Sequence, residues 1–96
     1  MKKMIKNQKD FKKELHTKHY LNGQLAVFVY NNSGEPIAEL SIMNNSMELA
    51  SNEFILKDYS ENKNLAQDLI DSQFITPTNR FILIGSHLCP ICQIET

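Results

Sequence analysis

The stretch Tyr20–Tyr30, YLNGQLAVFVY, decides the fold predicted from this sequence, together with the run GEPIAELSI at Gly34–Ile42 that follows it. Asn22-Gly23 separates two extended runs, and Asn-Gly is the strongest short signal for a β-hairpin, because both residues tolerate the positive φ of a type I′ turn. Asn31–Pro36 supplies a second turn. The sequence therefore predicts a meander of three short antiparallel strands, the third at Ile37–Ile42.

The middle strand of this meander, Gln24–Tyr30, is apolar on both faces, which is typical of a covered strand. We therefore expect a layer to pack on each side of it. The segment before the meander, residues 5–15, fits a helix or a strand. The Asn22-Gly23 turn favours a strand for the residues just before it, because a hairpin needs two arms.

The rest of the chain predicts one helix and further short strands. Ser60-Glu61-Asn62 offers capping residues for a helix whose apolar stripe contains Leu65, Ala66, Leu69 and Ile70. Short strands are predicted at Phe54–Leu56 and Phe81–Ile84, with a last extended piece at Ile91–Ile94. The predicted fold class is α+β: a single antiparallel sheet of about five strands, with an N-terminal meander and one covering α-helix.

The length of 96 residues fits one small domain. We divide the chain into a polar, Lys-rich N-terminal segment, residues 1–10, and a single α+β domain, residues 11–96. Residues 1–20 contain seven lysines and two acidic residues, a net charge of +5, whereas the remainder contains three basic and nine acidic residues, a net charge of -6. A basic head thus precedes an acidic body. The simplest interpretation of the head is a solvated, partly disordered segment.

Composition and motifs argue against catalysis. The chain shows no Gly-rich phosphate loop, no paired-carboxylate motif and no nucleophile with a recognisable base, so we predict a protein that is not an enzyme and needs no cofactor. It also lacks the apolar run of a membrane helix and the apolar core of a signal peptide, so a cytoplasmic protein with no membrane partner is expected. Cysteines are reduced in that compartment.

Cys89-Pro90-Ile91-Cys92, preceded by His87, has the spacing of a zinc half-site or a thiol redox pair. His87, Cys89 and Cys92 are therefore weak candidates for metal ligands. The chain has no second cysteine pair, and the motif does not open a helix as a redox cysteine would. Ordinary packing is the favoured interpretation, and no metal site is predicted.

Two charged surfaces are candidates for partner binding. Asp68 and Asp71 lie in the second half of the predicted helix, where a negative charge opposes the macrodipole. A local rule broken in this way can mark a surface kept for a partner. The predicted partner-binding residues, which could dock on a basic groove of a nucleic-acid enzyme, are Glu61, Asp68, Asp71, Glu35 and Glu39.

The alternative surface is basic and would bind nucleic acid. Its candidate residues are Lys12, Lys13 and Lys18, which lie near rings that could stack on bases. The acidic remainder of the chain argues against this alternative, because it would repel phosphates.

The order of motifs resembles a small domain family of unknown function that recurs on plasmids and conjugative transposons of Gram-positive bacteria. The resemblance rests on Asn22-Gly23 followed by Leu25-Ala26-Val27, on Gly34–Ile42 and Asn44, and on Phe54 followed by a helix. It covers residues 15 to 95 and is specific over residues 20 to 44. The family's C-terminal pattern is not matched at Gly85–Pro90, so nothing is carried over there.

The resemblance implies an accessory protein of a mobile element. Small proteins of such elements often inhibit host defence, and the acidic body would suit the basic channel of a guided nuclease. The leading hypothesis is therefore an anti-CRISPR-type inhibitor that binds a type II effector nuclease or impedes its guide RNA loading, as a monomer or weak homodimer. The alternatives are a nucleic-acid-binding accessory protein of plasmid transfer and a small zinc-binding module.

Overall fold

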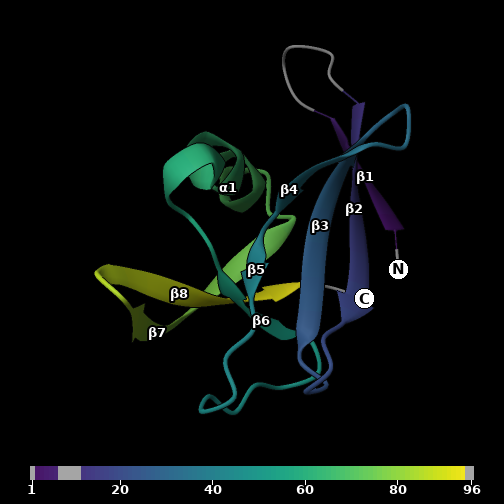
Figure 1. The fold of residues 1–96 in the computed structure, drawn as a ribbon. Helices are drawn as coiled ribbons and strands as arrows, with labels where there is room; N and C mark the ends of the chain where they lie inside the picture. The colour runs from purple at the N-terminus through teal and green to yellow at the C-terminus, as the bar shows by residue number, and fades with distance from the viewer. Residues whose placement is uncertain (1, 7–11, 95–96) are drawn as a thin grey trace.

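The computed structural model describes residues 2–6 and 12–94, which form two four-stranded antiparallel sheets and one helical segment (Figure 1). Sheet A has the strand order β1 (Lys2–Lys6), β2 (Lys12–His19), β3 (Leu25–Asn31), β4 (Pro36–Glu39). Sheet B has the order β5 (Ser41–Ile42), β6 (Glu53–Leu56), β8 (His87–Ile94), β7 (Ile75–Ile84). Between β6 and β7 lie the 3₁₀ turn η1 (Ser60–Asn62) and the helix α1 (Lys63–Asp71).

The α+β class is thus confirmed, but the prediction of a single sheet is wrong. The predicted third strand is split at Leu40: its first part, β4, pairs with β3, and its second part, β5, pairs with β6. Leu40 still donates its N–H to Val27 at 2.8 Å, while the Ser41 hydroxyl accepts the N–H of Val27 at 2.8 Å. At the crossing, the Ser41 hydroxyl therefore takes the place of a backbone carbonyl as the acceptor for Val27. The chain can leave sheet A while the buried N–H of Val27 keeps a hydrogen-bond partner.

The two turns of the meander have the same pattern of backbone hydrogen bonds. In the first, Gly23 donates its N–H to Tyr20 and Tyr20 donates its N–H to Gln24, with Gly23 at φ +88°. Asn22 is not in the left-handed region, so this is a three-residue loop with glycine at the αL position rather than the type I′ turn expected. The turn at residues 31–35 repeats both bonds, with Gly34 at φ +86°.

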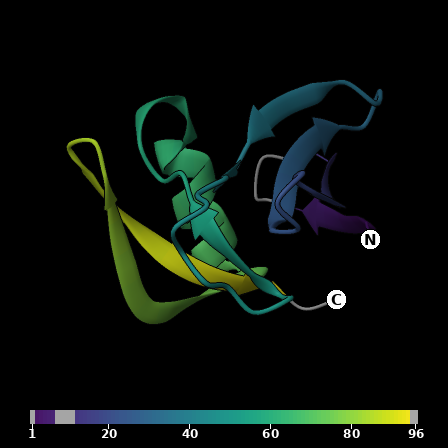
Figure 2. The ribbon, with the colours of Figure 1, turned by 60° about the horizontal axis from the view of Figure 1, so that its bottom comes forward.

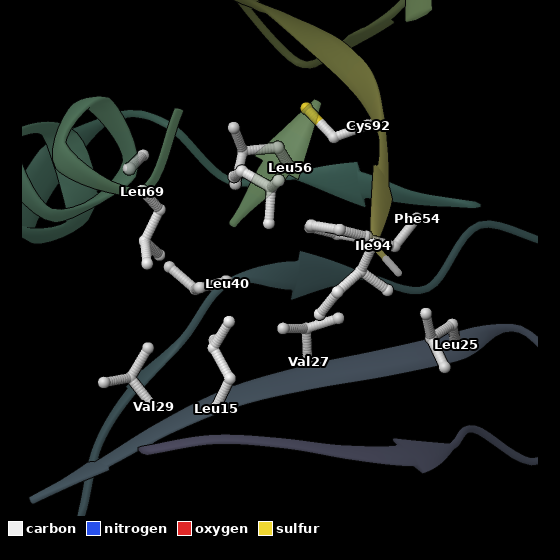
Figure 3. Close-up of a cluster of buried hydrophobic side chains, with 12 residues drawn as sticks. Leu15, Leu25, Val27, Val29, Leu40, Phe54, Leu56, Leu69, Cys92 and Ile94 are labelled. Atoms are coloured by element: carbon white, nitrogen blue, oxygen red, sulfur yellow. The ribbon is translucent and has the colours of Figure 1, made fainter. Parts of the chain in front are cut away.

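The main core lies between the two sheets and is closed on one side by α1 (Figure 3). Sheet A contributes Leu15, Leu25, Val27 and Val29, sheet B contributes Phe54, Leu56, Ile75, Cys92 and Ile94, the helix contributes Ala66 and Leu69, and Leu40 lies at the crossing. The prediction of the helix is confirmed, both in its position and in its apolar stripe. Ala66 and Leu69 are buried, and Leu65 and Ile70 pack beside them.

Sheet B carries a second, smaller core on its other face. Ile55, Cys89 and Ile91 are buried there, and the loop after β5 covers them with Met47 and Leu49. The β7–β8 hairpin extends from this sheet and projects away from the rest of the molecule in both ribbon views (Figures 1 and 2). The middle strand β3 places Leu25, Val27 and Val29 in the main core against sheet B, which supplies one of the two layers expected to cover this strand.

Three segments differ from the prediction in extent. Residues 2–6 of the Lys-rich segment form a strand, β1, which pairs with β2 from Lys2 opposite His16 to Lys6 opposite Lys12. β7 begins at Ile75, because a bulge between Pro77 and Arg80 accommodates the turn-like residues inside the strand. β8 begins at His87 and not at Ile91.

Candidate functional site

The exposed face of α1 carries the acidic residues predicted to bind a partner. Asn64, Gln67, Asp68 and Asp71 are all exposed and follow the i, i+3, i+4, i+7 spacing of one helix face. Asp71 accepts a hydrogen bond from Gln67 at 2.8 Å, and within residues 2–6 and 12–94 neither Asp68 nor Asp71 forms an ion pair. No basic residue occupies the last helical turn, so both carboxylates oppose the macrodipole.

A second group of acidic residues lies at the N-terminal end of this helical segment. Glu61 is paired with Lys57 at 2.9 Å, and the charges of Glu61 and Glu39 both raise the pKa of Lys57, the Glu61 hydrogen bond being the larger cause. Glu39 and Glu61, from a strand and a turn far apart in sequence, thus both act electrostatically on one lysine. We call Glu39, Glu61, Asp68 and Asp71 the acidic surface.

Asn62 connects the segments that carry Glu39, Lys57 and Glu61. Its buried side chain donates to the carbonyl of Glu39 at 2.8 Å and to that of Lys57 at 3.1 Å. The start of the helix is therefore tied both to the end of β4 and to the chain leaving β6. The sequence suggested a capping residue at this point, but Asn62 makes no cap bond to its own helix and serves as a tertiary link instead.

The side chain of Glu39 is held by Tyr20. Its hydroxyl donates to the Glu39 carboxylate and lies 2.8 Å from the Ser41 hydroxyl oxygen, so one ring connects the first turn, β4 and β5. Burial, and then the hydrogen bond to Glu39, raise the pKa of Tyr20 to about 12. The phenol is therefore neutral and a donor over the whole physiological range.

We expect stability to fall in alkali as Tyr20 ionises. Its pKa is higher in the folded chain than in the unfolded one, so its contribution is fully present below about pH 10 and is lost as pH rises from about 10 to about 12. Denaturant unfolding between pH 8 and pH 11.5 should show a steeper decline for the wild type than for Tyr20→Phe. Equal slopes for the two proteins would contradict the assignment of this group.

Two other acidic residues, the predicted Glu35 and Glu53, lie apart from the acidic surface. Glu35 is exposed in the turn between β3 and β4, where its carboxylate accepts from Ser33 at 3.2 Å. Glu53, the first residue of β6, is buried, pairs with Arg80 at 3.2 Å and accepts the Ala50 N–H. Glu53 therefore serves the fold of sheet B and is not available to a partner.

Of the candidates for nucleic-acid binding, Lys18 lies on the outer face of sheet A. Lys18 lies over the ring of Phe28, 5.7 Å from its centroid, and the rings of His16 and Tyr30 stack at 4.2 Å. Register places His16 opposite Phe28 on adjacent strands, so these groups share one face. Lys12 and Lys13 begin β2, but their side chains lie outside what the structure describes.

The Cys-x-x-Cys motif does not form a half-site in this fold. Residues three apart in a strand face opposite sides, and accordingly Cys92 belongs to the main core while Cys89 belongs to the smaller one. His87 stacks on the ring of Tyr59 at 3.7 Å. Among the described residues, no cluster of three or more potential metal ligands occurs. Burial raises the pKa of the Cys92 thiol to about 12, which keeps it protonated and unreactive.

A shallow hollow lies along α1 beside the acidic surface. It has a volume of about 260 Å³ and is lined by Asp58, Lys63, Asn64, Ala66, Gln67 and Ile70. That volume is below the range of about 300–1,000 Å³ typical of small-molecule sites. The hollow is therefore small for a site that encloses a drug-sized ligand.

Comparison with known proteins found no family model, curated protein or solved structure that matches this chain. The resemblance to a family of mobile elements thus stays a prediction. The structure itself adds one finding on membranes: over residues 2–6 and 12–94, no helix has the length and apolar character needed to cross a bilayer.

Proposed function

We propose that this chain is a non-enzymatic inhibitor that acts by occupying a basic, nucleic-acid-binding surface of another protein. The observation that carries the proposal is the pair Asp68 and Asp71, exposed on one helix face and ion-paired to no described residue. Both charges oppose the helix dipole at a cost of about 0.3–1 kcal/mol each. A basic partner surface would turn this local cost into a gain in binding.

The proposed partner is a CRISPR effector nuclease of type II, or its state before guide RNA loading. This choice is supported by the sequence resemblance to mobile-element proteins and by the net charge of -6 on residues 21–96. A guided nuclease holds its heteroduplex in a positively charged channel. An acidic protein lodged there would exclude RNA or DNA without any chemical step, in the cytoplasm where such effectors act.

Charge reversal at the acidic surface should weaken binding without harming the fold. We expect Asp68→Lys/Asp71→Lys to lose at least about tenfold in affinity for the effector, since like charges facing across an interface are strongly unfavourable. The same variant should be more stable by about 0.3–1 kcal/mol per site, because a lysine near a helix C-terminus favours the dipole. Pull-down and thermal unfolding measured side by side would test both expectations.

A matched control separates the position of the charge from its amount. Glu48→Lys changes one charge in the same way as Asp68→Lys but at an exposed residue of the loop between β5 and β6. We expect Glu48→Lys to bind nearly as the wild type does and Asp68→Lys to bind more weakly. Equal losses for the two single variants would mean that only overall charge matters, and unchanged binding of the double variant would reject the acidic surface.

A nucleic-acid-binding function is the second candidate, favoured by Lys18 over Phe28 and the stacked rings of His16 and Tyr30. Stacking rings beside cations on a sheet face suit single-stranded nucleic acid. The pull-down distinguishes the two when it is repeated with ribonuclease. Recovery of the effector in both samples supports direct docking, whereas recovery only without ribonuclease supports binding through RNA.

A further inference from the structure

β7 is the outermost strand of sheet B, and its second half presents an open edge. The hairpin loop contains only Gly85 and Ser86, with Ile84 opposite His87. In a two-residue hairpin this flanking pair is hydrogen-bonded, and the pattern then alternates along the strand. The backbone groups of Ile82 and Ile84 therefore face β8, and those of Phe81 and Leu83 face away from it.

No described backbone group outside β8 pairs with this edge. No backbone hydrogen bond joins Phe81 or Leu83 to a described residue outside the β7–β8 ladder. The hairpin tip projects from the molecule in two different views (Figures 1 and 2). An edge of this kind is a template for pairing with another strand.

The features that protect β7 from pairing with another strand end at Arg80. The first half of the strand contains Pro77, a bulge between Pro77 and Arg80, and Asn79 at φ +69°, and all three obstruct the approach of another strand. The second half, Phe81–Ile84, has neither a charge nor a proline. The other described edges differ: β5 has 2 residues, β4 has 4 and starts at Pro36, and β1 carries three lysines among its 5 residues, a charge that disfavours pairing with a second copy of itself.

We propose that β7 pairs with β7 of a second copy of this chain, antiparallel and with the two-fold axis at Ile82. In this register Phe81 of each copy is opposite Leu83 of the other. The two-fold axis generates two such pairs, and each is a hydrogen-bonded pair of the antiparallel ladder. Arg80 is opposite Ile84, so no like charges meet across the edge. A single two-fold register uses every free backbone group of Phe81 and Leu83, which makes the edge complementary to itself.

The exposed side chains near this edge also favour pairing with a second copy of the chain. Phe81 and Leu83 are 53% and 66% exposed, and Leu88, which is opposite Leu83 on β8, is 61% exposed. These three residues share one face of the hairpin, because alternate residues of a strand, and residues directly opposite each other, face the same side. Pairing of two copies would place two such apolar groups side by side. The contact is small, so we expect a weak dimer, visible at about 0.1–1 mM protein.

Sedimentation velocity from about 10 µM to 1 mM tests the dimer without reference to any other partner. The wild type should shift from monomer to dimer, and Leu83→Lys should remain monomeric. Leu21→Lys is the matched control, because Leu21 is an equally apolar residue, 106% exposed, in the first turn far from this edge in sequence; this variant should dimerise as the wild type does. Circular dichroism of each variant confirms that the fold is kept.

Amide hydrogen exchange identifies the contact itself. The amides of Phe81 and Leu83 should exchange freely at low protein concentration and at least about tenfold more slowly at 1 mM, as a newly paired strand requires. A chain that is monomeric throughout, aggregates that grow without limit, or a dimer that leaves these two amides unprotected or survives Leu83→Lys would each overturn the proposal.

Discussion

Phe54→Ala should lower the free energy of unfolding by about 3–5 kcal/mol, because it empties the largest side-chain volume of the main core. Phe54 is fully buried between the two sheets, beside Ile94 and Leu56 of sheet B and opposite Leu25 and Val27 of sheet A (Figure 3). A domain of this size has only about 5–15 kcal/mol in total. The variant should therefore be close to unfolding at ambient temperature.

Phe81→Ala is the matched control, since it deletes the same side chain from a site that is 53% exposed. At a few micromolar protein we expect it to cost less than about 1 kcal/mol. Urea unfolding of the two variants gives both values. A loss below about 1 kcal/mol for Phe54→Ala would contradict a core shared by the two sheets.

Asn62→Ala should cost about 1–3 kcal/mol, although it removes only one small polar side chain. The substitution removes the donor to the carbonyls of Glu39 and Lys57, and each of these two part-buried hydrogen bonds contributes about 0.5–1.5 kcal/mol. Because the same two bonds tie the helix to both sheets, the substitution should also loosen the pairing of Glu61 with Lys57.

Asn64→Ala provides the comparison, since Asn64 is exposed on the same helical segment. It should change stability by no more than about 0.5 kcal/mol. Thermal unfolding of the two variants, with the Lys57 side-chain resonances followed by NMR, separates a local effect from a global one. Similar unfolding temperatures for both variants would show that Asn62 is not a tertiary link.

The hairpin and the helix could be predicted because their signals are local. Asn22-Gly23 and Asn31–Pro36 mark turns by their own conformational preferences, and the apolar stripe of α1 repeats at helical spacing. The structure keeps both turns and changes only the type of the first, from two residues to three.

The division into two sheets could not be predicted, because it depends on contacts between distant residues. Ile37–Ile42 alternates without interruption, so nothing in the pattern marks Leu40 as a crossing. The crossing exists because the Ser41 hydroxyl takes over the N–H of Val27. β1 was missed for a related reason: its lysine-rich sequence has no strand pattern, and it is defined by its pairing with β2.

The candidate site was predicted in part. The exposed carboxylates of α1 were identified from the sequence, because their conflict with the helix dipole is visible in the order of residues. The engagement of Glu39 by Tyr20 and of Glu61 by Lys57 is tertiary, and so is the burial of Glu53. The sequence likewise could not show that Cys89 and Cys92 belong to different cores.

The most direct test of the proposed function is DNA cleavage by a type II CRISPR effector, mixed with the chain before or after its guide RNA is added. The account predicts that the wild type blocks cleavage near equal molar amounts and that Asp68→Lys/Asp71→Lys needs at least about tenfold more protein for the same effect. Cleavage that proceeds at the same rate with excess wild-type protein, whichever is added first, would contradict inhibition of this effector by occupancy.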